Sequence, residues 1–145
     1  MNVDVRYVLI SDYATMDHAG KLVVAGMYLE DIVVQQIPTI VSSLVFTVLA
    51  KSPASPVNLK MRLRAPSRAV VIEGDVTVGP SPDPEGRSVV GFQFAQLPLP
   101  EEGRYSMSFS EHGKDAEEIE IHNFRVLAGP IPSHLVPQQL KSSTV

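Results

Sequence analysis

The segment from Val57 to Val78, VNLKMRLRAPSRAVVIEGDVTV, holds two alternating runs of apolar and polar residues around a short turn. Every second residue is apolar in residues 57–64, and the alternation returns in residues 70–78 after a polar, proline-containing turn. Period-two alternation is typical of a strand with one buried face, and proline favours a turn. The segment therefore predicts an antiparallel hairpin.

The register of this hairpin follows from where the turn is centred. A turn centred on residues 66–67 places Leu63 opposite Val70 and Lys60 opposite Glu73. Slipping the pairing by one residue would set apolar side chains against polar ones along the whole ladder. We therefore expect this register, with opposite charges facing each other across a solvated surface.

Similar patterns recur along the chain. Residues 104–110 alternate cleanly, and less regular strands are expected at residues 3–13, 20–34, 41–50, 88–97 and 117–127. In the last segment the apolar parity changes between Ile121 and Phe124, which predicts a β-bulge near His122. About eight strands with short turns predict an all-β fold, an antiparallel β-sandwich of immunoglobulin-like or related Greek-key topology.

Length and composition limit the function classes. The 145 residues suit one domain, a β-sandwich over residues 1–128 followed by a proline-rich tail over residues 129–145. The absence of cysteine excludes disulfides, thiolate zinc sites and cysteine nucleophiles, and a net charge of −4 demands neither nucleic acid nor a membrane as partner. The sequence shows neither a signal peptide nor a long apolar stretch, so we expect a soluble, cytoplasmic protein.

Asp12, Asp17 and His18 are the candidate binding residues, because carboxylates and imidazole can hold a divalent metal. Their spacing matches no known coordination loop, and the nearby Gly-Lys lacks the rest of a phosphate loop. Residues 17–20, Asp-His-Ala-Gly, are typical of a hairpin turn. We therefore expect a turn here, with no metal and no other cofactor.

The remaining polar motifs indicate surface structure and not chemistry. The stripe of Lys60, Arg62 and Arg64 could follow phosphates, but the expected acidic partners across the hairpin favour charge pairing. The four histidines are scattered, and the adjacent glutamates at residues 101–102 and 117–118 point to opposite faces of a strand. No catalytic residue is predicted.

The stretch LPLPEEGRYSM, residues 97–107, resembles the corner of immunoglobulin-type sandwiches, in which a tyrosine hydroxyl bonds to backbone upstream. Tyr105 would be this structural residue, and Met107 takes the place that a cysteine has in antibody domains. The alternative is that Tyr105 is an ordinary core aromatic.

A family resemblance rests on several short motifs: Asp12, Gly20-Lys21-Leu22, Gly26, Pro38, Leu97-Pro98, Gly103-Arg104-Tyr105 and Phe124-Arg125-Val126. In this order they resemble a family of functionally uncharacterised bacterial proteins, short single-domain β-sandwiches classed as a domain of unknown function. The resemblance covers about residues 5–127. It implies a bacterial origin and a sandwich, and it brings no activity.

Two functions fit these observations. The first is a non-enzymatic binding or assembly module, and the alternative is a small-ligand or metal-dependent protein with a site in the end loops at residues 12–20, 79–88 and 111–116.

Residues 21–29 and 44–49 are apolar on both strand faces, more than one sandwich core can cover. We therefore expect a homodimer. The tail, through Ile131, Leu135 and Val136, is the competing cover.

Overall fold

The computed structural model describes residues 3–29, 31–82 and 85–130, and these residues confirm the all-β fold. The described part contains one short 3₁₀ helix, η1 (Asp115–Glu117), and eleven strands where about eight were expected. The strands are β1 (Val5–Met16), β2 (Leu22–Met27), β3 (Ile32–Val34), β4 (Thr39–Val41), β5 (Leu44–Lys51), β6 (Val57–Arg64), β7 (Val70–Val78), β8 (Arg87–Phe94), β9 (Leu97–Leu99), β10 (Gly103–Glu111) and β11 (Ile119–Ala128). The three extra strands, β3, β4 and β9, are short. The segments expected at residues 20–34 and 88–97 each divide, and β4 lies before the segment expected at residues 41–50.

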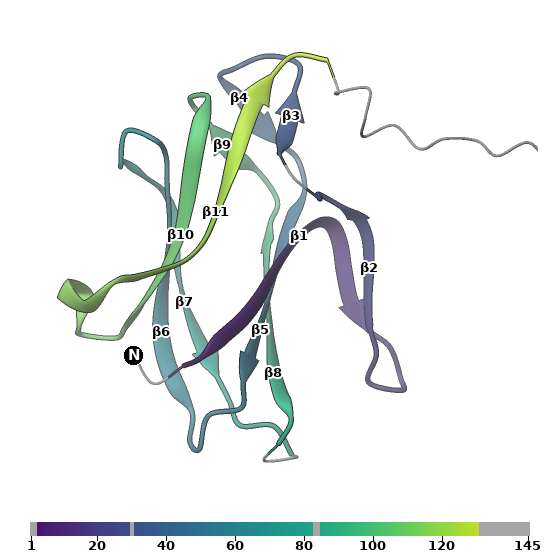
Figure 1. Ribbon diagram of the computed structural model, residues 1–145, viewed down its shortest axis with the longest axis vertical. Helices are drawn as coiled ribbons and strands as arrows, with labels where there is room; N and C mark the ends of the chain where they lie inside the picture. The colour runs from purple at the N-terminus through teal and green to yellow at the C-terminus, as the bar shows by residue number, and fades with distance from the viewer. Residues whose placement is uncertain (1–2, 30, 83–84, 131–145) are drawn as a thin grey trace, which may run out of the picture.

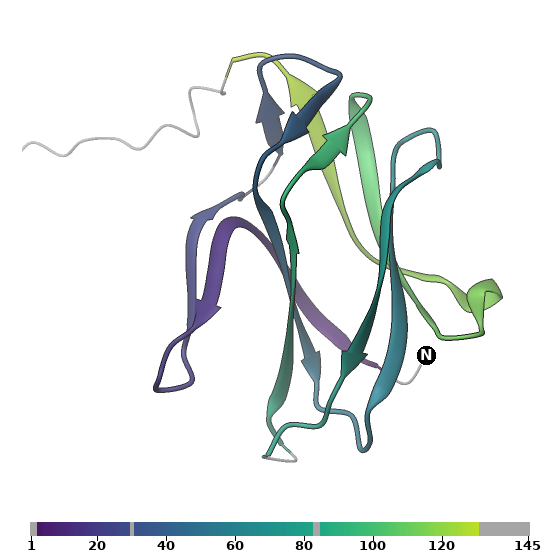
Figure 2. The same ribbon diagram turned by 180° about the vertical axis from the view of Figure 1, so that it is seen from behind.

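The strands form two larger sheets that face each other (Figures 1 and 2). One has the order β2-β1-β5-β8 and the other the order β3-β11-β10-β6-β7, while β4 and β9 form a small two-stranded sheet. Every pair is antiparallel except β3 with β11, which is parallel and departs from the expected all-antiparallel arrangement. A relation to immunoglobulin-like or Greek-key topology stays a prediction.

The core lies between the two larger sheets. Phe46 of β5 is fully buried and contacts Phe124 of β11 with ring centroids 5.7 Å apart, so the two sheets meet through aromatic side chains. From β6 and β10 the alternating residues Leu59, Met61, Leu63, Tyr105, Met107 and Phe109 enter the same core, each at most 1% exposed. The alternation in the sequence therefore identified the buried face of both strands correctly.

The β6–β7 hairpin forms, but the expected register is wrong by two residues. Leu63 pairs with Ile72 and Lys60 pairs with Asp75, so that Arg62, and not Lys60, lies opposite Glu73. The turn is wider than expected, because the amide of Ala65 donates to the carbonyl of Ala69, and the register shifts beside it. A two-residue slip keeps apolar against apolar, so alternation alone could not detect it.

The bulge expected near His122 is present one residue earlier. Met107 pairs with His122 and Ser108 pairs with Glu120, so Ile121 is the extra residue on β11. After it, Phe124 returns to the core.

The β1–β2 hairpin extends away from the sandwich, on the outer side of the four-stranded sheet (Figures 1 and 2). We call residues 13–25, the end of this hairpin, the arm. None of its residues is buried. The predicted tail begins at residue 129, and its residues 131–145, with Ile131, Leu135 and Val136, lie outside the described residues.

Within the described residues, no helix is long and apolar enough to cross a membrane.

Candidate functional site

Asp17 and His18 lie in the turn at the tip of the arm, as the sequence predicted. The carboxylate of Asp17 accepts hydrogen bonds from the amides of Ala19 (2.9 Å) and Lys21 (2.8 Å), and Gly20 has a φ of 76°. The Asp17 carbonyl also accepts from the Gly20 amide, while the His18 side chain is exposed. The amides of Ala19, Gly20 and Lys21 are therefore satisfied within the turn itself.

Asp12 lies on the body of β1, five residues from Asp17, and forms a different structure. The Tyr28 hydroxyl donates to its carboxylate at 3.4 Å, and Gly26 lies against it with a φ of +67°. A Cβ on Gly26 would lie only 2.5 Å from the Asp12 Oδ2 atom. The absence of a side chain at Gly26 therefore lets β2 pass close to the Asp12 carboxylate.

The structure does not bring Asp12 together with Asp17 and His18. Five residues of extended strand separate Asp12 from Asp17 by about 16 Å. Among the described residues, no group of three or more histidine, aspartate or glutamate side chains is placed to hold a metal ion. Asp12 and Asp17 instead have structural partners within the hairpin.

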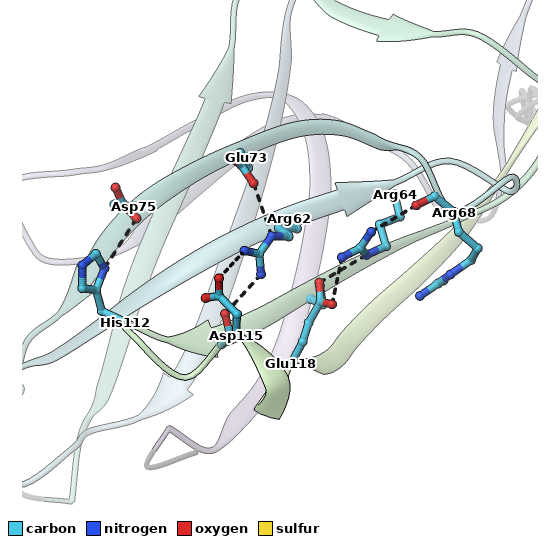
Figure 3. Close-up of polar contacts among 10 residues, drawn as sticks. Arg62, Arg64, Arg68, Glu73, Asp75, His112, Asp115 and Glu118 are labelled. Atoms are coloured by element: carbon cyan, nitrogen blue, oxygen red, sulfur yellow. Dashed lines mark hydrogen bonds and ion pairs between the residues drawn. The ribbon is translucent and has the colours of Figure 1, made fainter.

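The outer face of the five-stranded sheet carries a network of ion pairs, which we call the charged face (Figure 3). Arg62 contacts Glu73 at 3.3 Å and Asp115 at 3.2 Å, and its side chain is only 12% exposed. Arg64 binds both carboxylate oxygens of Glu118, at 3.3 and 3.0 Å. Segments far apart in the sequence, β6, β7 and the η1 region, thus supply opposite charges to one surface.

Glu118 is the residue on this face that sequence reasoning missed. The sequence predicted that Glu118 is a solvated surface residue. Its carboxylate instead accepts hydrogen bonds from the Arg64 guanidinium and, at short range, from the Ser108 hydroxyl. Burial on its own would raise the pKa of Glu118, but these hydrogen bonds outweigh burial and the pKa is lowered. Its position beside β6 depends on how η1 folds back, which no local pattern encodes.

The two arginines of the cationic stripe of β6, Arg62 and Arg64, are paired with partners from the same chain. The expectation that charges pair across the hairpin is met by Arg62 and Glu73, and not by Lys60 and Glu73. Arg68, in the turn, donates to the Ser106 hydroxyl at 3.1 Å. These arginine side chains are engaged along the sheet surface, not held free for phosphates.

The loops at one end of the sandwich form an open depression that contains few ionisable side chains. Its volume is about 700 Å³, and it is lined by residues 53–58 together with Glu111 and His112. His112 lies 4.0 Å from Asp75, with both side chains largely exposed. Of the three loops proposed for a ligand site, only residues 111–116 contribute here, whereas residues 12–20 lie on the hairpin and its arm.

The outer face of the four-stranded sheet is apolar. Strand pairing aligns Tyr7 with Leu49 and Val89, aligns Met27 with Ser11 and Val45, and brings the arm residues Tyr13, Ala25, Thr15 and Val23 to the same side. We call Tyr7, Tyr13, Val23, Met27, Val45, Leu49 and Val89 the apolar face. The other residues on this side of the sheet are small or uncharged. At one end two cationic residues, Lys51 and Arg87, lie opposite each other on β5 and β8.

Several members of the apolar face are open to solvent. Tyr7 is 58% exposed, Tyr13 is 54% exposed and Met27 is 45% exposed. At the centre of the same surface Thr47 is 2% exposed, and its hydroxyl finds no hydrogen-bond partner in the part of the chain that the structure describes. Sequence reasoning identified residues 21–29 and 44–49, but it missed Tyr7 and Val89, which only sheet pairing aligns with them.

Tyr105 is completely buried in the core. Its hydroxyl donates to the Glu101 carbonyl at 2.6 Å and accepts from the Glu101 amide at 3.2 Å. The hydroxyl therefore fastens the turn four residues upstream to the start of β10. A relation of this corner to that of immunoglobulin domains stays a prediction.

Comparison with known proteins gives a family but no activity. A family model described as "Family of unknown function (DUF6941)" matches residues 6–123, most of the chain. No curated protein matches the sequence significantly.

Proposed function

Because the chain belongs to this family of unknown function, we propose its role from geometry alone: a non-enzymatic assembly module that binds protein and forms a homodimer through the apolar face. The observation that carries this proposal is the exposure of large apolar side chains on one sheet face, among them Tyr7, Tyr13 and Met27. Solvent-exposed apolar surface of this extent is typical of an interaction site.

The area supports a dimer of standard size. From their fractional exposures, Tyr7, Tyr13, Val23, Met27 and Val89 together leave on the order of 450 Å² of surface open. A standard interface buries about 800 Å² on each partner, of which somewhat more than half is apolar. The exposed apolar area is therefore close to what one subunit contributes to a stable dimer.

The charged face supports the same assignment by contrast. Its Arg62 and Arg64 are neutralised by carboxylates of the same chain, which leaves little net attraction for nucleic acid. The resemblance to bacterial sandwich proteins and the absence of cysteine support a bacterial, cytoplasmic protein. Neither the paired arginines nor the family resemblance points to an enzymatic activity or to a membrane partner.

Size-exclusion chromatography with light scattering tests the proposal on the full-length chain. We expect a dimer at micromolar concentration, and we expect Val89→Glu to shift it to monomer because removing a carboxylate from water into the interface is costly. The matched control is Ile119→Glu, at a site on the other sheet that is 45% exposed, and this variant should remain dimeric.

A monomeric wild-type protein contradicts the proposal. Repeating the measurement on a chain ending at Ala128 separates the two possible covers. A dimer that appears only after this truncation would show that the tail covers the apolar face within one chain.

A further inference from the structure

The arm is apolar on both of its sides. Tyr13, Val23 and Ala25 project to the side of the apolar face, while Ala14, Met16, Leu22 and Val24 project to the opposite side. None of these residues is buried, and Met16 is 47% exposed. A two-stranded hairpin with no further packing is at best marginally stable in water, so an arm of this composition needs a surface to cover it.

The arm nevertheless has a defined local structure. At its base Gly26 packs against the Asp12 carboxylate, which also receives the Tyr28 hydroxyl. The Ser43 hydroxyl donates to the carbonyl of Asp12 at 3.3 Å, which ties this base to the residue before β5. At its tip the Asp17 carboxylate holds the turn through two backbone amides. Both ends of the arm are therefore fixed by specific bonds, as expected for an element that presents a surface.

The arm and the uncovered sheet lie next to each other in the fold. The arm continues the same sheet as β5 and β8, and it extends on that sheet's outer side (Figures 1 and 2). Tyr7 and Val89 lie on the sheet body, and Val23 lies on the arm, so the apolar surface is continuous from one to the other. A two-fold axis beside this surface would bring the arm of each copy onto the sheet body of the other.

We propose that two copies exchange arms, each arm covering the sheet-body part of the partner's apolar face, around Tyr7 and Val89. This inference rests on the proposed dimer and adds which element makes the contact. Exchange of an identical element between protomers satisfies both exposed surfaces at once, the arm and the sheet, which a contact between the two sheet bodies alone would not.

Cross-linking of introduced cysteines tests the exchange, since the natural chain has none. Chains carrying Val23→Cys and differently tagged chains carrying Val89→Cys are mixed, allowed to exchange subunits and treated with a bifunctional maleimide. We expect a covalent product joining the two kinds of chain. The matched control replaces Val89→Cys with Ile119→Cys on the other sheet, and we expect no product from that mixture.

The outcomes separate the two proposals. A dimer by light scattering that gives no product between Val23→Cys and Val89→Cys chains overturns arm exchange but leaves the dimer intact. A monomer overturns both. A chain carrying both cysteines that links only within itself would show the arm folded onto its own sheet, which also overturns the exchange.

A second variant tests the arm without cross-linking. Val23→Glu changes an exposed arm residue that makes no core contact, so we expect an unchanged fold by circular dichroism and at least a tenfold weaker dimer. A dimer of unchanged strength in this variant contradicts arm exchange.

Discussion

The two outer faces of this sandwich differ in how far their side chains are paired or covered by other residues of the same chain. On the charged face, Arg62 and Arg64 are paired with carboxylates of β7 and the η1 region, so these cationic side chains are neutralised within one chain. On the apolar face, Tyr7 and Met27 are about half exposed, although the Arg87 guanidinium lies over the Tyr7 ring, 5.8 Å from its centroid. The comparison is consistent with the proposal that the apolar face, and not the charged face, contacts a second copy.

The depth of burial beneath the charged face supports this interpretation. Ser106, Ser108 and Ser110 point outward from β10, yet each is at most 8% exposed, because the arginine side chains and Glu118 lie over them. Long arginine stems cover surface while their charged ends remain near solvent. Beneath the arginines the charged face is therefore packed. On the apolar face Ser11, Val45 and Thr47 are also buried, but Tyr7, Tyr13 and Met27 remain about half exposed.

Removal of Arg64 is the largest expected effect. Arg64→Ala removes the bidentate partner of Glu118 and exposes the serines beneath. We therefore expect the free energy of unfolding to fall by about 2 kcal/mol. Urea denaturation measures this change. The control is Arg104→Ala, whose exposed side chain bonds to the Asn123 side chain and should cost about 0.5 kcal/mol or less. Equal losses in both variants would mean that the network is no more than ordinary surface charge.

Glu118→Gln should have a smaller effect that depends on pH. The hydrogen bonds from Arg64 and Ser108 lower the pKa of Glu118 below its ordinary 4.5, so the carboxylate stabilises the fold above that pH. The stabilisation is lost as the pH falls from about 4.5 through the lower folded value. We expect the variant to lose about 1 kcal/mol at pH 7, by exchanging charged hydrogen bonds for neutral ones.

Urea denaturation of wild type and Glu118→Gln at a series of pH values measures this difference. The two proteins should converge in stability toward acid pH. A gap that stays constant with pH would contradict an ionised role for Glu118.

Thr47→Val is the smallest expected change and has the opposite sign. The Thr47 hydroxyl is buried without a hydrogen-bond partner among the described residues, and valine keeps its shape. We expect a gain of a few tenths to about 1 kcal/mol in thermal or urea unfolding. Thr15→Val, at an exposed site on the arm, is the control for a general effect of added apolar surface. A loss of stability in Thr47→Val would show that this hydroxyl has a partner, which would then be sought in the second copy.

The sequence predicted strand parity well and strand register poorly. Alternation correctly assigned Leu63 to the core and Arg62 to the outer face of the sheet, because every second side chain of a strand points the same way. It could not place Glu73, since registers that differ by two residues bury the same side chains. The hydrogen bonds of the turn, between Ala65 and Ala69, made that choice.

The candidate site divides in the same way. The turn at Asp17 was predictable, because its bonds connect residues at most four apart. The partnership of Arg64 with Glu118 spans 54 residues, and nothing in either local sequence indicates the other. Local chemistry is visible in a sequence, whereas contacts between distant strands depend on topology.

The sequence by itself determined that residues 21–29 and 44–49 are apolar on both strand faces. Only the tertiary structure decided that these similar segments have opposite environments. β5 is a central strand between β1 and β8, so side chains of the neighbouring strands flank its own on each face, and Leu44 to Val48 are all buried. β2 is an edge strand that continues into the arm, and Val23 and Met27 remain exposed there. Burial depends on the strands that lie on either side, and a linear sequence does not state which strands these are.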